Sequence, residues 1–355
     1  MGITTEMMEN LDKSYMFQKI AELPDQIREG WQIAAGADRP IDFDRIHSIV
    51  FAGMGGSAIA GDIIREFLGH ALRMPFYVNR EYGLPGFAGS GTLLIASSYS
   101  GNTEETLSAV GEGLQRGCDW IAVTSGGQLG ETARQKERPL FVLPPGYPPR
   151  AALGYSLGVL LNLFSPLVPD LGESEIEATV NFLKDESGPW LDIGHHQNKP
   201  LALAETLSGR LPLLYTSVGP GEAVAMRWKA QINENAKAHV FVGLMPEMNH
   251  NEIMGWEQNQ GNIDILKMMA PVMIRFENDH ERVRLRMALT RRIIERIEVG
   301  VHEIEARGSN LLDQMLYLIL FGDLVSFYMA ILHGVNPTEI GNINALKKGL
   351  QSSQS

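Results

Sequence analysis

The feature that most constrains the fold is an alternation, present in both halves of the chain, of short apolar runs and helical patterns. The runs occupy 47–53, 76–78, 92–98, 120–125 and 140–144, then 211–217, 239–243, 272–276 and 299–306, and five of them end at glycine or serine. Continuous apolar runs of this length are typical of strands buried on both faces of a parallel sheet. The pattern predicts an α/β fold with two doubly wound parallel sheets, which bind ligands at the carboxyl ends of their strands.

The length agrees with two domains, because a chain of 355 residues is more than twice the ~150 residues of a typical domain. Proline, glycine and acidic residues cluster at 165–175, where we place the boundary. We expect a helical segment, two sheet domains and a C-terminal tail, at 1–45, 46–170, 171–335 and 336–355.

The charge balance narrows the class of partner. The chain has 30 Lys and Arg against 42 Asp and Glu, a net charge of −12, which argues against nucleic acid or an anionic membrane surface. Because Asp313, Gln314 and Asp323 interrupt the apolar run at 311–332, we expect a buried core helix there rather than a membrane span. The N-terminus lacks the pattern of a signal peptide, so we expect a cytoplasmic protein.

The cysteine and histidine content argues against a metal centre. Cys118 is the only cysteine, which excludes a disulfide framework and a cysteine-based zinc site. His250 and Glu252 match half of the zinc-deaminase motif, but its P-C-x-x-C half requires two cysteines. No H-E-x-x-H occurs in the sequence, and we expect neither a metal nor a cofactor.

A glycine turn follows the first predicted strand. Gly53-Met54-Gly55-Gly56-Ser57-Ala58 precedes a helical pattern, and glycines there let an anion approach the free N–H groups of a helix N-terminus. The turn fits G-x-G-x-x-A, but no Lys-Ser/Thr pair makes it a P-loop. It can be a phosphate or cofactor loop or only a tight turn.

A serine-rich loop follows the strand predicted at 92–98. Ser98, Ser100 and Thr103 gather around Gly101, and Asn102 or Thr103 can cap the next helix. Capping needs one side chain, whereas several neutral donors beside helix N–H groups are what a phosphomonoester requires. A dinucleotide site has no use for these hydroxyls, so the loop favours a phosphate ester as ligand.

These motifs resemble the SIS (sugar isomerase) fold, which binds phosphosugars at a Ser/Thr-rich loop. Together with PPRAALGY, QINENAK, MNHNEIMGW and INALKKGL, they are similar to the bifunctional phosphoglucose/phosphomannose isomerases of the phosphoglucose isomerase superfamily. The resemblance covers about 47–350. It implies two flavodoxin-like SIS subdomains, a phosphosugar substrate and a homodimer.

The resemblance also implies a role for particular residues. The phosphate loop falls on Ser98, Ser100 and Thr103 and the glycine turn on Gly55, Gly56 and Ser57, while Arg150, Glu234, His250 and Lys347 take the catalytic positions. In this superfamily the ring-opening histidine comes from the neighbouring subunit. The family's threonine tied to dual specificity has Thr338 as its nearest candidate here.

The chemistry of aldose–ketose isomerisation fits these residue types. Glu234, near the C-terminal end of a predicted helix, suits the base that moves a proton between C2 and C1. His250 can donate and accept a proton near neutral pH to open the sugar ring. Arg150 can stabilise the enediolate oxygen, and Lys347 can assist at the ring oxygen.

Three alternatives remain at this point. A non-catalytic SIS regulator usually carries a basic helix-turn-helix domain, and 1–45 is short and not basic. The isomerase half of a glucosamine-phosphate synthase follows a glutaminase domain with a cysteine near its N-terminus, which this sequence lacks. A Rossmann oxidoreductase explains the glycine turn but not the serine-rich loop.

Overall fold

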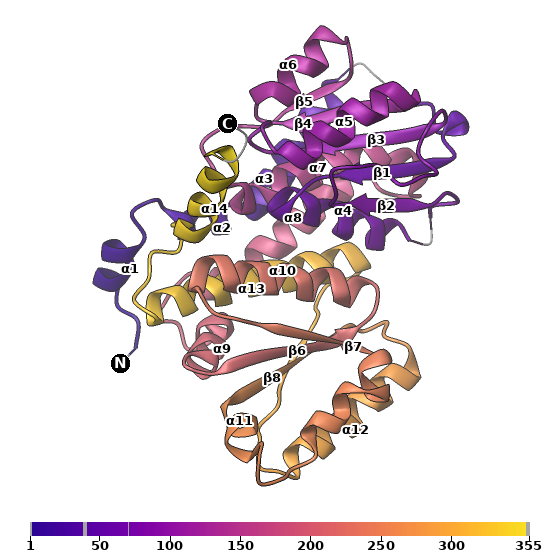
Figure 1. Cartoon of the computed structure of the whole chain (residues 1–355). Coiled ribbons are helices and arrows are strands. Elements are labelled where there is room, and N and C mark those ends of the chain that lie inside the picture. The colour runs from indigo at the N-terminus through magenta and orange to yellow at the C-terminus, as the bar shows by residue number, and fades with distance from the viewer. Residues whose placement is uncertain (1, 38–40, 70, 353–355) are drawn as a thin grey trace.

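The computed structural model describes residues 2–37, 41–69 and 71–352 (Figure 1). Residue 1 and 38–40 of the predicted N-terminal segment, and 353–355 of the predicted tail, lie outside the described residues. Two parallel sheets form, one in each half of the chain, as predicted. The α/β class predicted from the alternating pattern is therefore confirmed.

The first sheet has the strand order β2-β1-β3-β4-β5, with all neighbours parallel. Its strands are β1 (Ser48–Ala52), β2 (Phe76–Asn79), β3 (Thr92–Ser97), β4 (Asp119–Thr124) and β5 (Leu140–Val142). This is the flavodoxin-like order, in which the order of the strands across the sheet reverses between β1 and β3. Ala52 pairs with Ala96, so the loops that follow these strands leave the sheet side by side at that switch point.

The second sheet repeats this order with one strand fewer, as β7-β6-β8-β9. Its strands are β6 (Leu211–Ser217), β7 (Phe241–Met245), β8 (Met269–Arg275) and β9 (His302–Glu305). The strand predicted at 239–243 lies two residues later, because its pairing with β6 continues to Met245 and ends at Pro246, which has no N–H to donate.

Helices cover both sheets. In the first half they are α1 (Thr5–Leu11), α2 (Met16–Ala21), α3 (Leu23–Ala35), α4 (Gly55–Leu68), α5 (Glu104–Arg116), α6 (Gly127–Gln135) and α7 (Leu153–Phe164). In the second they are α8 (Glu173–Ser187), α9 (Lys199–Leu207), α10 (Pro220–Ala236), α11 (Ile263–Met268), α12 (Glu281–Glu295), α13 (Leu311–Leu332) and α14 (Gly341–Ser352). In Figure 1, α10 and α13 lie between the two sheets, and one apolar core includes residues of both halves.

Helix α13 is long and apolar enough to cross a membrane, yet 94% of its most apolar 18-residue window is buried inside the protein. Its acidic side chains have polar partners: Asp313 accepts from Thr179 at 2.7 Å, and Asp323 pairs with Arg227. Buried carboxylates are tolerated when they are paired in this way. The prediction of a core helix is confirmed.

The N-terminal helix α3 lies against α7 at very short range. A Cβ on Gly30 would lie 2.2 Å from the Tyr155 carbonyl oxygen, and one on Gly158 would lie 2.1 Å from that of Ile27. From α3, the buried amide of Gln26 donates to the Ala151 carbonyl at 2.8 Å. The N-terminal segment thus supports the short 3-10 turn η2 (Pro149–Ala151), which carries Arg150.

Candidate active site

The glycine turn and the serine-rich loop meet at the switch point of the first sheet. Helix α4 begins at Gly55, which has a φ of +50°, and its N-cap residue Met54 makes no side-chain cap. The N–H groups at the start of a helix have no intrahelical acceptor, and here Gly55 and Gly56 occupy those positions, whereas the Ser57 N–H donates to the Met54 carbonyl at 3.1 Å. The Ser57 hydroxyl accepts from the Tyr99 N–H at 3.1 Å, which ties the two loops together.

Gly56 is required by packing. A Cβ at this position would lie 2.8 Å from the Cα of Arg150, so any side chain would displace the turn that carries the arginine. The glycine turn therefore does two things in this fold: it exposes a helix N-terminus and lets Arg150 approach it.

Two of the three hydroxyls predicted to converge in the serine-rich loop, those of Ser98 and Thr103, are in contact. Ser98 Oγ and Thr103 Oγ1 are 2.8 Å apart, and the exposed Ser100 accepts from the Asn102 N–H at 3.3 Å. Helix α5 starts after Thr103, but the Thr103 side chain does not cap it, because its hydroxyl is bonded to Ser98. Asn102 instead accepts from the N–H of Gln128, in the first turn of α6. The prediction that Asn102 or Thr103 caps α5 is therefore wrong.

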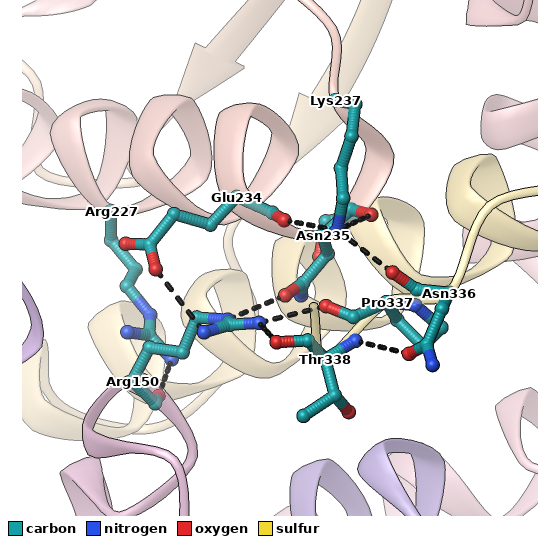
Figure 2. Close-up of polar contacts among 9 residues, drawn as sticks. Arg150, Arg227, Glu234, Asn235, Lys237, Asn336, Pro337 and Thr338 are labelled. Carbon is teal, nitrogen blue, oxygen red and sulfur yellow. Dashed lines mark hydrogen bonds and ion pairs between the residues drawn. The ribbon is translucent and has the colours of Figure 1, made fainter. Parts of the chain in front are cut away.

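Arg150 and Glu234, predicted from separate motifs, are in direct contact (Figure 2). The Arg150 side chain is 3% exposed, and its Nη1 lies 3.2 Å from Glu234 Oε2. Its Nε donates to Asn235 Oδ1 at 2.7 Å, and its Nη2 donates to the carbonyls of Pro337 at 2.7 Å and Thr338 at 3.1 Å. Burial is the main cause that lowers the Arg150 pKa, and the charge of Glu234 opposes it. All of these partners accept, so the guanidinium is held charged and fixed in direction.

Both residues line a cavity of about 130 Å³ with the glycine turn. Gly55, Gly56, Arg80, Arg150 and Glu234 are among its lining residues. Glu234 also lines a second hollow of about 500 Å³, together with Lys237, His239 and 339–343. The Glu234 side chain is 26% exposed.

His250 and Lys347 are not brought to this cavity within one chain. His250 is exposed in the 3-10 helix η5 (Glu247–His250), which follows β7. Parallel strands β6 and β7 end at the edge of the sheet where α10 begins, whereas Glu234 lies near the far end of that helix, roughly 20 Å away at 1.5 Å per residue. Lys347 is exposed on α14, and only the first turn of that helix borders the larger hollow.

Arg227 and Asp323 form a buried pair beside the site that was not predicted. Arg227 donates to Asp323 through Nε at 2.9 Å and Nη2 at 2.7 Å, and Nη2 also donates to the Arg150 carbonyl at 2.7 Å. Burial raises the pKa of Asp323, and Arg227 opposes this. An acidic residue inside an apolar helix implies a buried partner, so Asp323 was the available signal.

Among the described residues, no group of three or more His, Cys, Asp or Glu side chains is arranged to hold a metal ion. The described hydroxyls, helix N-termini, one arginine and one carboxylate make a site suited to an anionic ligand with an acidic C–H or O–H group.

Comparison with known proteins gives concordant results. Residues 196–350 match the bacterial phospho-glucose isomerase C-terminal SIS domain. The chain is 39% identical to a bifunctional phosphoglucose/phosphomannose isomerase of Caldicellulosiruptor bescii over 94% of this chain and 98% of the relative. It is 34% identical to the Aquifex aeolicus protein of the same name over 87% and 92%. A hypothetical protein from Thermus thermophilus has the same fold, with a TM-score of 0.77, 13% identity, and coverage of 99% of this chain and 93% of that one.

Proposed function

The chain belongs to the family of bifunctional phosphoglucose/phosphomannose isomerases, and from this premise we propose that it interconverts glucose 6-phosphate and mannose 6-phosphate with fructose 6-phosphate. The observation that carries the proposal is the contact of Arg150 with Glu234, 3.2 Å apart, in a cavity shared with the glycine turn. A base beside a fixed cation is what proton transfer through an enediolate requires.

The phosphate is held mainly by dipoles. Ser98, Ser100 and Thr103 supply hydroxyls, and Gly55 and Gly56 begin the first turn of α4. The partial positive charge of a helix N-terminus and free hydroxyl protons favour an anion without a net positive protein. This accounts for an anionic substrate in a chain whose net charge is −12.

Glu234 moves the proton between the two carbons. In the open-chain aldose its carboxylate takes the proton from C2, giving a cis-enediol(ate), and returns it to C1. The hydroxyl proton of O2 moves to O1, so that the carbonyl forms at C2 and no atom is gained or lost. Arg150 stabilises the charged oxygen of the intermediate, because its guanidinium is buried and already oriented.

A homodimer completes the site in this proposal. His250 lies at the other end of α10 from Glu234, so the ring-opening histidine comes from a second copy of the chain. Exposed apolar side chains support such a contact: Met254, beside His250, is 63% exposed, and Leu346, beside Lys347, is 65% exposed. Lys347 then acts at the ring oxygen once α14 is fixed by assembly.

One intermediate serves both sugars. Glucose 6-phosphate and mannose 6-phosphate differ only at C2, which becomes planar on deprotonation, so both lead to the same enediol. Thr338 is the candidate for tolerance at C2: its carbonyl contacts Arg150, and its buried hydroxyl has no hydrogen-bond partner among the described residues. The reaction needs no metal or cofactor, and we place the enzyme in the cytoplasm, with neither nucleic acid nor membrane as a partner.

The direct test is to incubate the purified protein with each aldose phosphate, with EDTA and without nucleotide, and to measure fructose 6-phosphate. We expect product from both sugars. Product from neither sugar, with phosphosugar binding retained, would instead indicate the non-catalytic regulator that shares this fold. Activity abolished by EDTA would contradict the metal-free mechanism.

A further inference from the structure

Lys237 lies at the end of α10, three residues after Glu234, and its side chain folds back over the helix terminus (Figure 2). The residue has a left-handed φ of 55°. Its Nζ donates to the carbonyls of Glu234 at 2.8 Å, Asn235 at 3.2 Å and Asn336 at 2.8 Å. All three donors of the ammonium group therefore have an acceptor.

The contact joins two segments that are distant in sequence. The last carbonyls of a helix have no intrahelical donor and carry partial negative charge, so a lysine ammonium fits the end of α10. The third acceptor, Asn336, follows α13. Lys237 thus ties the stretch 336–338 to the helix that carries Glu234.

The same stretch holds Arg150. The two residues after Asn336, Pro337 and Thr338, provide the carbonyls that accept from Arg150 Nη2. The Asn336 side chain also accepts from the Thr338 N–H at 2.8 Å, which makes the stretch a tight turn. A change in the position of Asn336 therefore alters the acceptors that set the direction of the guanidinium.

We propose that Lys237 is a positioning residue, which holds 336–338 against the end of α10 and so keeps Arg150 aimed beside Glu234. The inference rests on the proposed function, since it assigns Lys237 its effect on turnover through Arg150. Lys237 is the last residue of the QINENAK motif, and the family resemblance implies no role for it.

The charge state of Lys237 gives the inference a pH signature. Burial and then the charge of Arg150 lower the Lys237 pKa to about 8, against the opposing effect of Glu339 and Glu234. The other titratable groups nearby are His239, which lines the same hollow, and His333, whose Nδ1 contacts the Ala236 carbonyl at 2.9 Å.

Because the pKa is lowered, the ammonium is present below about pH 8 and is lost as the pH rises through that value. A neutral amine has two donors for the three carbonyls and no charge to attract the helix end. The positioning contact therefore weakens in mildly alkaline solution.

The experiment compares Lys237→Met and Lys237→Arg with Lys229→Met as a control on the same helix, two turns earlier. In Lys237→Met we expect kcat to fall on the order of ten-fold, since small displacements of catalytic groups are costly, with KM little changed. In Lys237→Arg, whose guanidinium does not titrate, most activity is kept and the loss of kcat above about pH 8 moves to higher pH. Lys229→Met should match the wild type.

The inference is overturned if Lys237→Met keeps normal kcat, or if Lys237→Arg keeps the wild-type alkaline limb. Should Lys237→Met fail to fold, the Lys237→Arg profile decides. Amide hydrogen exchange of 335–339 gives a second readout that needs no substrate: it should be faster in Lys237→Met than in Lys229→Met, and equal rates would contradict the contact. If the wild-type protein turns over neither sugar, the proposed function is wrong. The hydrogen-exchange rates of 335–339 would still show whether Lys237 holds that stretch in place.

Discussion

The two halves of the chain share a strand order, yet they differ in what lies at the switch point. In the first half the loop after β3 carries Ser98, Ser100 and Thr103, whose bonds are to one another or to the adjacent backbone. In the second half the loop after β8 carries Asp279, which accepts from the Ser217 hydroxyl at 2.6 Å and from the Phe276 N–H at 2.9 Å. At the second switch point, therefore, the protein's own carboxylate accepts from a hydroxyl and from a backbone N–H, whereas in our proposal the hydroxyls of the first half serve a ligand.

The glycines do not distinguish the halves. Gly219 precedes α10 with a φ of +84°, and a Cβ on Gly221 would lie 2.3 Å from Thr216 Oγ1, so the second half needs glycines as strictly as the first. Their common requirement is the tight strand-to-helix turn. The fold supplies a switch point in each half, and in our proposal the side chains of the loops decide which one binds an anion.

In our proposal the second half instead contributes the base. Glu234 lies near the C-terminal end of α10 and Glu222 in its first turn. We predict that Glu234→Gln lowers kcat by roughly 10²–10⁴-fold, the typical contribution of a general base, and leaves phosphosugar binding intact. Glu222→Gln is the matched control and should keep near-normal turnover. Steady-state kinetics and calorimetric binding separate the two quantities, and a Glu234→Gln enzyme with normal kcat would remove Glu234 from the mechanism.

The buried Arg227–Asp323 pair connects the two halves of the chain, because Arg227 on α10 also donates to the Arg150 carbonyl. We expect Arg227→Met to lower the free energy of unfolding by roughly 3–5 kcal/mol, since it leaves a carboxyl group unpaired in the core. Arg291→Met breaks surface pairs with Glu295 and Glu303, and because exposed ion pairs contribute little to stability, the variant should unfold close to the wild type. Urea unfolding measures both; equal losses would show that the buried pair has no special weight.

The sequence predicted what depends on local pattern. Strand β6 and helix α13 have the predicted bounds, 211–217 and 311–332, because apolar runs and their breaks are properties of neighbouring residues. The contact between the Ser98 and Thr103 hydroxyls is local in the same sense, since the two residues are five positions apart.

Contacts between residues far apart in the sequence could not be predicted from local patterns. Gln26 contacts Ala151 across 125 positions, and Arg227 contacts Asp323 across 96, and no local periodicity encodes such partners. Thr103 shows the opposite failure: its type and position fit a helix cap, but a nearby Ser98 competes for the hydroxyl. The role proposed for Lys237 likewise depends on Asn336, which is 99 positions away.

The hydroxyls of the two switch points allow a reciprocal test. Ser100 is exposed, so Ser100→Ala should raise KM about ten-fold, the loss of one hydrogen bond to a charged group, and leave stability within about 0.5 kcal/mol. Ser217 is buried against Asp279, so Ser217→Ala should lower the free energy of unfolding by about 1–2 kcal/mol and leave KM unchanged. If Ser217→Ala raised KM and Ser100→Ala did not, the phosphate site would belong to the second half.

The smallest effect is expected from Asp279→Asn, which removes the internal negative charge and keeps the shape of the side chain. Asparagine can accept from the Phe276 N–H and donate to Ser217 Oγ, so the cost in stability should stay below about 1 kcal/mol. Neutralising Asp279 frees at most one hydroxyl, whereas the first half offers three on its loop, so titration with glucose 6-phosphate should still show one site per chain. A second binding event in Asp279→Asn, absent from the wild type, would mean that the carboxylate alone separates the two halves, and that the second crevice is an anion site closed by its own side chain.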